Sequence, residues 1–438
     1  MTTINVSNSS QLQSALSHAA GGDTIVLAAG NYGTSYINDR NYSAGVTIKS
    51  ASLSNRAHFD YLAISNSNNL RFEGLDVGHA LRHGENPSSP YARVTDSDNI
   101  KMVGMSFHGS LDNHPANDGV GLNVTNSDHF QLMGSTFRDL YRGAYIQQAS
   151  DVTVASNSFQ MIRTDGLDFG AVNGAVVDKN SFTNFHPIAG DHADAIQFWL
   201  TGQPHGSSNI AITNNTIMQG SGTGMQGIFM SDPKAFGYNN VRIQNNLVYG
   251  NDQYHGIFLN GVHGAQVIGN TMLSKSTDHK MMWIDLHNGS NFTVRDNLAE
   301  SIQVQRGATG VSMSHNATPA TVGSFHALFP HLDAPTSVND LITHGYGYQL
   351  PGSISTGIAP VATALGQSIG SMVGPTSTAT SAQVSHTVVA EPTHAPPTLS
   401  QVFPSAPHVE MVANTVTVPV TVTHQFFMPH FNHFVAMV

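Results

Sequence analysis

The sequence contains no cysteine, which excludes a disulfide bond, a thiolate metal site and a cysteine nucleophile. Charged residues make up only 10% of the chain, and its 17 basic residues form no cluster. With a formal net charge of −11, a nucleic-acid-binding surface is not expected. No run of about 18 apolar residues is present, so no membrane span is expected. The first residues also lack the basic and apolar segments of a cleavable secretory signal.

The residues that are abundant are typical of many short strands joined by turns. The chain has 41 glycines and much Asn, Ser and Thr, whereas the Glu and Lys of surface helices are scarce. Apolar residues make up 40%, which is too many for a disordered chain. The composition therefore indicates an all-β fold, which in a solenoid can run beyond the length of an average domain.

A short phrase recurs from about residue 62 to about residue 315. Each copy holds an alternating apolar run, such as Asn99–Val103, and later copies continue with an Asn and an apolar residue two positions beyond. The Asn positions are Asn157, Asn180, Asn215, Asn246, Asn270 and Asn297, and the apolar positions include Phe107, Phe137, Phe159 and Phe182. Repeats of roughly 20–50 residues without a helical period indicate a solenoid. We therefore predict a single-stranded parallel β-helix with an Asn ladder in its turns and a Phe stack inside.

The chain divides into three regions. Residues 1–49 are predicted to form a strand and a capping helix, because Leu12 and Leu16 share one apolar face and Gly21 follows the helix. Residues 50–345 are predicted to form the β-helix itself. Residues 346–438 are a low-complexity tail rich in Ala, Thr, Ser and Pro. We interpret the tail either as a disordered segment or as an export or attachment segment.

Two columns of residues accompany the first strand of successive repeats. The first column precedes the strand and consists of Asp118, Arg142, Asp165, Asp194, Gln226 and His255. The second lies at the next outward position and consists of Gly121, Tyr145, Asp168, Gln197, Phe229 and Phe258. Long turns at 199–209, 218–225 and 231–240 lie beside both columns, and long turns on a solenoid commonly build binding walls. The pattern predicts a groove with a charged centre.

Residues 163–199 form the centre of this groove. They hold two copies of one pattern, Asp165–Phe169 and Asp194–Phe198. Because neighbouring strands lie about 4.8 Å apart, the acidic side chains of the two copies should face the same side close together. Carboxylates that close repel one another, so one stays protonated or all of them hold a cation. The predicted metal ligands are Asp165, Asp168, Asp191 and Asp194, with Ca²⁺ as the candidate ion and no organic cofactor.

Other polar side chains lie beside the acidic residues. His192 stands between two of them and is a candidate general base or acid. Arg142 and Arg163 could neutralise an acidic ligand or form surface ion pairs. The predicted catalytic residues are Asp165, Asp168, His192, Asp194, Arg163 and Tyr145, and the predicted substrate-binding residues are Arg142, Gln197, Trp199, Gln226 and His255. The alternative is that the acidic residues are ordinary solvated turn residues, because Asp-Gly is a common turn dipeptide.

The opening of the chain resembles the pectin-lyase-like right-handed β-helix superfamily, and within it most of all the chondroitinase B and alginate lyase group. The residues that carry this resemblance are Gln11-Leu12-Gln13-Ser14-Ala15-Leu16, Gly22-Asp23-Thr24-Ile25-Val26-Leu27-Ala28-Ala29-Gly30-Asn31-Tyr32 and Val46-Thr47-Ile48-Lys49. The segment Arg163–Asp168 is similar to the Asn-Thr-Asp-Gly-Ile-Asp phrase of polygalacturonases, in which the Asp matching Asp165 is catalytic. The segment Asp191–Asp194 is similar to the Asp-Pro-His-Glu phrase of mannuronan epimerases.

The resemblance implies a right-handed coil and a polysaccharide substrate. The first hypothesis is a lyase that cleaves an acidic, uronate-containing polysaccharide by β-elimination. Ca²⁺ or an Arg would neutralise the uronate, His192 would take the C5 proton, and Tyr145 or an acid would protonate the leaving oxygen. The alternatives are an inverting glycoside hydrolase that uses Asp165, Asp168 and Asp194, a uronate C5-epimerase, and a non-catalytic polysaccharide-binding surface protein. A secreted or cell-surface location is expected, and the sequence indicates no oligomeric state.

Overall fold

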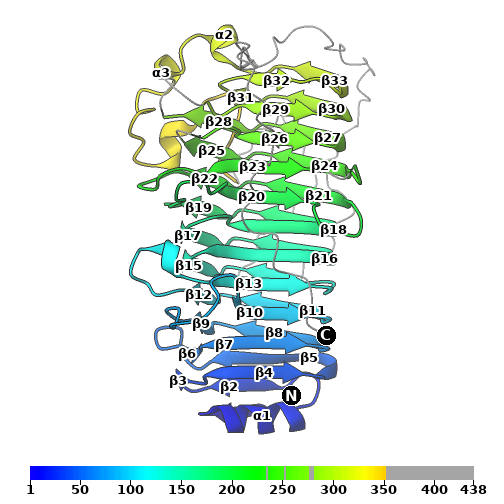
Figure 1. Ribbon diagram of the computed structural model, residues 1–438, viewed down its shortest axis with the longest axis vertical. Coiled ribbons are helices and arrows are strands. Elements are labelled where there is room, and N and C mark those ends of the chain that lie inside the picture. Colours follow the sequence, from blue (N-terminus) through cyan, green and yellow to red (C-terminus); the bar gives the residue numbers. More distant parts are fainter. Residues whose placement is uncertain (233–234, 251–252, 276–280, 352–438) are drawn as a thin grey trace, which may run out of the picture. The chain divides into compact units, whose positions relative to one another are not determined.

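The computed structural model describes residues 1–232, 235–250, 253–275 and 281–351, and these residues wind into a parallel β-helix (Figure 1). The strands lie on three faces of the coil. The first and second faces merge into one 22-stranded sheet, because β16 (Arg142–Ala155) and β18 (Leu167–Asp178) run through both. The third face is a separate 11-stranded sheet. The predicted all-β solenoid is confirmed.

The strands of each face follow one another along the coil. The first face contains β4 (Thr34–Asn38), β7 (Tyr61–Ser65), β10 (Pro90–Thr95), β13 (Val120–Thr125), the first halves of β16 and β18, β20 (Asp194–Trp199), β23 (Gln226–Ser231), β26 (Ile257–Asn260), β29 (Ile284–His287) and β32 (Ile302–Val304). The second face contains β1 (Thr3–Val6), β2 (Thr24–Leu27), β5 (Asn41–Ser50), β8 (Asn68–Glu73), β11 (Asp98–Val103), β14 (Gln131–Met133), the second halves of β16 and β18, β21 (Ser207–Thr213), β24 (Tyr238–Gln244), β27 (Val262–Ile268), β30 (Gly289–Arg295) and β33 (Ala308–Ser314). The third face contains β3 (Gly30–Asn31), β6 (Ala57–Phe59), β9 (Asp76–Gly78), β12 (Ser106–His108), β15 (Thr136–Leu140), β17 (Ser158–Ile162), β19 (Ser181–Thr183), β22 (Thr216–Met218), β25 (Leu247–Gly250), β28 (Thr271–Ser274) and β31 (Leu298–Ala299).

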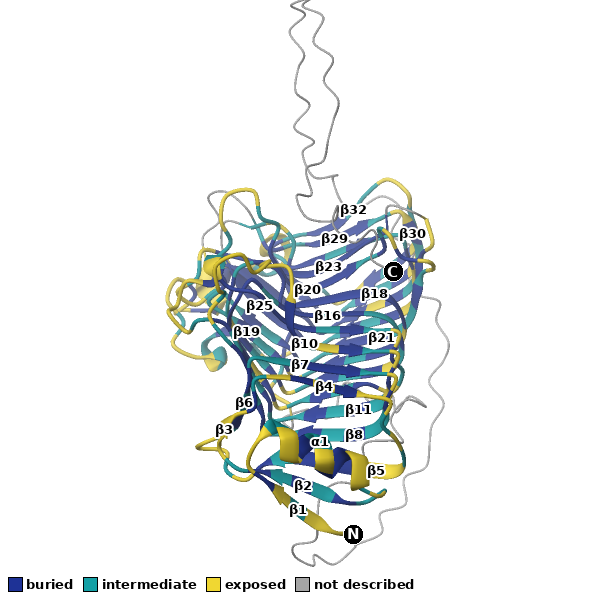
Figure 2. Ribbon diagram, turned by 60° about the horizontal axis from the view of Figure 1, so that its bottom comes forward, coloured by how far each residue is buried: buried dark blue, intermediate teal, exposed yellow. Residues whose placement is uncertain are grey.

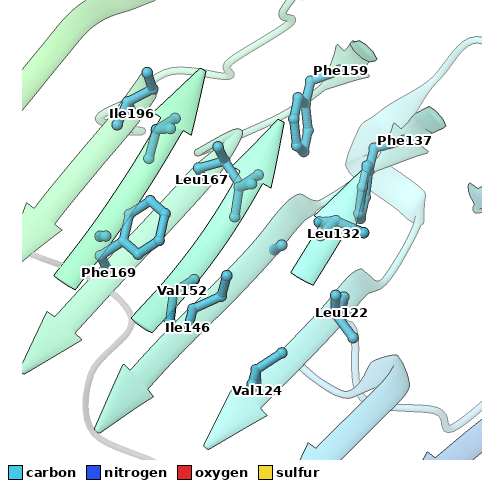
Figure 3. Packing of buried hydrophobic residues seen from close by; sticks show 14 of the residues in the cluster. Leu122, Val124, Leu132, Phe137, Ile146, Val152, Phe159, Leu167, Phe169 and Ile196 are labelled. Atoms are coloured by element: carbon cyan, nitrogen blue, oxygen red, sulfur yellow. The ribbon is translucent and has the colours of Figure 1, made fainter. Parts of the chain in front are cut away.

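The hydrophobic core fills the inside of the coil. Side chains alternate between the two sides of a strand, so the apolar half of each alternating run points inward and is buried. Figure 2 shows that buried residues are concentrated in the strands. The predicted Phe stack is present: ring centroids along Phe107, Phe137, Phe159 and Phe182 are 4.6, 4.6 and 4.9 Å apart. Figure 3 shows two of these rings, Phe137 and Phe159, facing Leu132, Leu167 and other aliphatic side chains.

The predicted Asn ladder occupies the turns between the second and third faces. Asn180 shows the pattern, since its Oδ1 accepts from both the backbone N and the Nδ2 of Asn157 at 3.0 Å. Its Nδ2 donates to the backbone O of Val154 at 2.9 Å and to Oδ1 of Asn215 at 3.0 Å. The same bonds link every predicted rung and extend to Asn316. The ladder therefore pairs backbone groups that a tight turn would otherwise bury without a partner.

A helix covers the first turn of the coil, as predicted. The α1 helix (Ser9–His18) buries Leu12, Ala15 and Leu16. Asn8 caps it, because its Oδ1 accepts from the backbone N of Gln11 at 2.9 Å. The helix shields the apolar interior of the coil from water at this end.

The end of the coil differs from the prediction. The strands stop at β33, whereas the β-helix was expected to reach residue 345. The short helices α2 (Pro319–Val322), α3 (Phe325–Leu328) and η2 (Val338–Leu341) follow, and Phe325 and Leu341 pack on Leu247 and Leu298 of the third face. The apolar residues after β33 do not alternate with a period of two, so this segment does not continue as strands.

The first residues of the predicted tail belong to the packed structure. Tyr348 is 3% exposed, and its backbone N donates to Oγ1 of Thr271 at 2.8 Å. The rest of the predicted tail, including the proposed export or attachment segment, lies outside the described residues. No helix within the described ranges is long and apolar enough to cross a membrane.

The ladder predicts how the coil responds to loss of one amide. Asn180→Ala should lower the free energy of unfolding by about 3 kcal/mol, because buried backbone groups at Val154 and Asn157 lose their partners. The matched control is Asn239→Ala, which removes an exposed amide on β24 and should cost less than about 0.5 kcal/mol. Urea unfolding of both variants measures the difference, and equal losses would contradict a structural role for the ladder.

Candidate functional site

The two predicted columns lie side by side on the first face. Tyr145, Asp168, Gln197, Phe229 and Phe258 occupy one register position on successive strands. Arg142, Asp165, Asp194, Gln226 and His255 lie three residues before them on the same rungs. The structure therefore brings together most of the predicted site residues.

The start of each column was predicted wrongly. Tyr145 is paired with Asn123 rather than Gly121, and Arg142 is paired with Val120 rather than Asp118. Gly121 lies against the core instead, since a Cβ at this position would approach the Phe137 ring to 2.9 Å. A longer turn before β13 shifts this copy of the repeat by two residues.

Arg142 links the two carboxylates at the centre. Its Nη2 donates to Oδ2 of Asp165 at 2.9 Å, and its Nε lies 3.1 Å from Oδ2 of Asp168. The Asp165 and Asp168 side chains are 4% and 2% exposed, whereas Arg142 is 18% exposed. Burial raises the pKa of Asp165 to about 6, with Asp194 acting in the same direction and Arg142 against it. Burial likewise raises the pKa of Asp168 well above its usual range.

His192 and Asp194 form a second charged pair on the next rung. His192 Nδ1 lies 3.1 Å from Oδ2 of Asp194, which also accepts from Nε2 of Gln197 at 2.6 Å. The negative charge of Asp194 raises the pKa of His192 to about 9, although burial opposes the shift. The imidazole is therefore protonated at neutral pH. His192 was predicted as a general base or a general acid, and below about pH 9 its protonation favours the acid.

Gln226 lies at the other ring nitrogen of His192. Its Nε2 is 2.8 Å from Nε2 of His192, which suits a neutral imidazole that accepts this bond. The Oε1 of the same amide is buried without a hydrogen-bond partner. If the amide turned by 180°, that oxygen would accept the Nε2–H of the protonated ring. Gln226 can thus serve either protonation state of His192.

Arg163 and Asp191 are engaged with one another beside this centre. The Nε and Nη2 of Arg163 donate to the two carboxylate oxygens of Asp191 at 2.8 and 3.0 Å. The guanidinium also stands 5.0 Å from the ring centroid of Tyr141. Asp191 accepts from the backbone N of Ile188 at 2.9 Å, so the pair fixes the loop before β20. This geometry favours a positioning role for two residues that were predicted as a catalytic group and a metal ligand.

The predicted calcium ligands do not fit one cation. Arg142 lies between Asp165 and Asp168, Arg163 holds Asp191, and Asp194 accepts from His192 and Gln197. A cation already stands at each carboxylate, so we build no step on a metal ion here. Within the described ranges, the groups of three or more acidic or histidine residues whose ligand atoms all lie within 4.8 Å of one another are elsewhere on the coil.

Aromatic rings continue the column beyond the charged centre. Trp199 lies 6.5 Å from Phe229, Phe229 lies 4.7 Å from Phe258, and Phe258 lies 4.9 Å from the His287 ring. Phe258 and His287 are partly exposed. The predicted Trp199 and His255 belong to this group, and the Phe258 ring lies 4.6 Å from His255.

Several residues of the site were not predicted as site residues. Trp283 donates from Nε1 to Nδ1 of His255 at 2.7 Å, and burial lowers the pKa of His255 to about 4, so this imidazole is neutral. Gln203 reaches in from the loop after β20 and donates from Nε2 to the Tyr145 hydroxyl at 2.8 Å. Neither residue belongs to the repeated phrase, so the sequence carried no periodic signal for them.

Unpartnered buried polar atoms gather on this part of the coil. Five of the seven buried side-chain atoms without a hydrogen bond among the described residues belong to the first face or to its adjoining loop: Asp168 Oδ2, which meets Arg142 only as an ion pair, and Asp194 Oδ1, Gln203 Oε1, Gln226 Oε1 and Asp285 Oδ1. Burying polar atoms without partners is costly, so their concentration at one place indicates a functional site rather than a scaffold. A hollow of about 610 Å³, lined by Asp232, Asn260, His263 and other residues, includes none of the predicted site residues.

Comparison with known proteins supports the β-helix fold. Residues 88–272 match the family described as the right handed beta helix region, which supports the predicted right-handed coil. No curated protein sequence matches the chain.

Among solved structures, an alginate lyase from Paenibacillus sp. is 18% identical, with 72% of this chain and 95% of that chain covered and a TM-score of 0.37. A PL6 family polysaccharide lyase from Pseudopedobacter saltans is 13% identical (78% and 98% covered, TM-score 0.44), and a surface adhesin of Streptococcus pneumoniae is 10% identical (71% and 86% covered, TM-score 0.43). Likenesses of this degree concern the fold alone.

The ion pair of His192 predicts an unusual titration. In the full-length chain, the His192 ring should titrate at about pH 9, and Asp194→Asn should move the midpoint down toward 6.5 because the neighbouring negative charge is lost. The stability that the pair contributes is complete below about pH 6.5 and is lost as the pH rises through about 9. Histidine NMR titration measures both midpoints, and His255, expected at about 4, is the internal control. A wild-type midpoint near 6.5 would contradict the pairing.

Proposed function

We propose that the protein cleaves an acidic, uronate-containing polysaccharide by β-elimination on the outer side of its first face. The observation that carries this proposal is the sign of the accessible charge. Although the chain has a net charge of −11, the carboxylates of the centre are buried, and the charged side chains that reach solvent above them are Arg142 and His192. These cations suit the carboxylates of a uronate chain.

The aromatic rings beside the centre support a sugar ligand. Pyranose rings have apolar faces that pack on aromatic side chains, and the partly exposed Trp199 and Phe258 offer such surfaces next to the cations. A polymer that lies along successive rungs would place its charged group at Arg142 and His192 and further sugars on the rings. A substrate of this kind is found outside the cell, so a secreted or cell-surface location belongs to the same proposal.

The elimination assigns one role to each accessible group. Arg142 neutralises the uronate carboxylate, which acidifies the C5–H bond. Neutral His192 takes the C5 proton at Nε2 once substrate displaces the Gln226 amide, and Asp194 orients the ring through Nδ1. The C5–H electron pair forms the C4=C5 double bond as the C4–O bond breaks. Tyr145 donates its proton to the leaving oxygen, and burial keeps its pKa above the usual range, so it stays protonated in alkaline solution.

These roles predict an alkaline lyase. Activity should rise as the pH passes about 9, because only the neutral form of His192 can accept a proton. The measurement is the absorbance near about 232 nm of the unsaturated product, recorded on a panel of uronate polysaccharides between about pH 6 and pH 10. His192→Gln and Tyr145→Phe should each lower kcat by roughly 100-fold or more. His263→Gln and Tyr36→Phe are the controls, since both side chains are exposed and away from the centre.

Other outcomes of that assay would select another function. New reducing ends without absorbance would replace the lyase with a hydrolase, and an altered uronate stereochemistry without chain cleavage would indicate an epimerase. Binding without any chemical change would indicate a polysaccharide-binding surface protein. No metal ion contacts the reacting sugar in this proposal.

Inverting hydrolysis is the second candidate because of the raised pKa values of two carboxyl groups. Asp168 keeps its proton to higher pH than an ordinary Asp and could serve as the acid, while Asp165 or Asp194 could activate a water. Its activity would fall as the pH rises through the raised pKa of Asp168, opposite to the lyase. Inverting hydrolysis ranks second because these carboxylates are buried and paired with Arg142.

The aromatic column predicts an effect on binding rather than on chemistry. Phe258→Ala should raise KM by about tenfold and leave kcat within about twofold, because a stacking surface binds substrate and transition state alike. Steady-state kinetics on the active polysaccharide measure the two constants separately. Tyr36→Phe again serves as the control, and a fall in kcat at unchanged KM would place Phe258 at the reacting sugar.

A further inference from the structure

A loop before the candidate site holds a separate acidic cluster. Residues 109–119 connect β12 to β13 and contain the short helix η1 (Pro115–Asn117). The loop folds back so that Asp112 and Asp118 meet Asp139 of β15, which lies on the next turn of the coil. One carboxylate oxygen from each residue lies within 4.8 Å of the others.

Uncharged donors hold these carboxylates in place. Asp118 accepts from the backbone N and the Oγ of Ser110 at 2.6 and 3.1 Å. Asp139 accepts through Oδ2 from the backbone N of Asn113 at 2.6 Å. Asp112 accepts from the backbone N of His114 at 2.9 Å and from Nδ2 of Asn117 at 3.0 Å. The loop is therefore organised around the carboxylates, yet none of these bonds supplies a positive charge.

Among the described residues, no cationic side chain forms an ion pair with this cluster, although the charges of Arg138 and His114 act on Asp139 and Asp112 from a distance. None of the ion pairs found in the described part of the chain includes Asp112, Asp118 or Asp139. The neighbouring Arg138 donates from Nη2 to Oδ1 of Asn113 at 2.8 Å instead. His108 and Asp118 interact only through their charges, since the His108 ring nitrogens bond Asp76 and the backbone O of Gly109. Like charges this close repel one another, and either a proton on one carboxyl group or a cation between them relieves the repulsion.

An unpartnered atom points to the missing ligand. Asp118 and Asp139 are both 0% exposed, and Oδ1 of Asp139 is buried without a hydrogen-bond partner. A buried carboxylate oxygen that lacks a donor is strongly unfavourable, and the fold around it would exclude it unless something binds there. Gly109 lets the Asp118 carboxylate approach the backbone closely, because a Cβ at that position would lie 2.3 Å from it.

We propose that Asp112, Asp118 and Asp139 bind a calcium ion that fixes the 109–119 loop. Calcium accepts six to eight oxygen ligands in flexible geometry, which suits three carboxylates on a loop and a strand. The softer transition metals prefer nitrogen or sulfur ligands, and the three proposed ligands offer oxygen only. This site is separate from the centre at Arg142 and does not depend on the proposed reaction.

The ion would support the wall next to the candidate site. The loop leads directly into β13, where Val120 pairs with Arg142. The backbone O of Gly119 accepts from the backbone N of Tyr141, the residue before Arg142, at 2.8 Å. Loss of calcium should therefore loosen the rung next to Arg142 while the rest of the coil remains folded.

The test uses the full-length chain freed of metal with EDTA and then dialysed. Adding about 1 mM Ca²⁺ should raise the Tm by roughly 5 °C. Tb³⁺ should bind with luminescence sensitised through Tyr91, whose hydroxyl accepts from the backbone N of Gly119 at 3.0 Å, and Ca²⁺ should displace it. Asp139→Asn preserves shape and should abolish both signals. Asp112→Asn changes an exposed ligand that the fold does not need, and should weaken Ca²⁺ by at least about tenfold.

The control variant is Asp76→Asn, which alters the His58–Asp76–His108 group on the third face. It should leave the calcium shift and the Tb³⁺ signal unchanged. The proposal is overturned if Ca²⁺ leaves the Tm of the metal-free chain unchanged, or if Asp112→Asn and Asp139→Asn both keep the full shift. A shift that Asp76→Asn alone removes would assign the ion to the other group. Lyase activity is not the readout, so failure of the reaction proposal leaves this test intact.

Discussion

The parallel register between turns is the constraint on which the rest of the structure depends. Each strand bonds only to the strands one turn before and one turn after it, so a residue at a given position meets the residue at the same position of the neighbouring turn. The Asn ladder pins that register inside the coil, since Asn157, Asn180 and Asn215 each bond the next rung through both backbone and side chain. A slip of one residue would turn every apolar side chain outward.

The same constraint concentrates charge on the outer side of the first face. Where the interior requires apolar residues on each turn, the exterior is free to vary, and here it places Arg142, Asp165 and Asp194 on successive rungs. Burial and neighbouring charges then give the groups at this centre different shifts in pKa. Burial raises the pKa of Asp165 and Asp168, while His192 keeps its proton because Asp194 lies against it. An acidic protein thus presents cations at its accessible centre.

The remaining functional contacts come from loops that interrupt the regular repeat. Gln203 reaches Tyr145 from a lengthened turn, and the loop from 109 to 119 gathers Asp112, Asp118 and Asp139 from two turns of the coil. Both depend on chain that leaves the repeat and returns to it. The regular coil fixes where these loops start and end, and their own turns decide which atoms meet.

The sequence by itself determined the coil, the capping helix, the Phe stack, the Asn ladder and the rungs that carry the site. These features repeat at fixed spacing or follow local rules of capping and alternation, so one copy informs the next. Only the tertiary structure decided that Arg142 bridges Asp165 and Asp168, that Arg163 is paired with Asp191, and that Trp283 bonds His255. It also decided that the short helices after Ser314 pack on the third face and that Asp139 joins Asp118. Such contacts join residues from different turns through side chains and loops of irregular length, and no periodic pattern in a single chain records which of several neighbouring charges will meet.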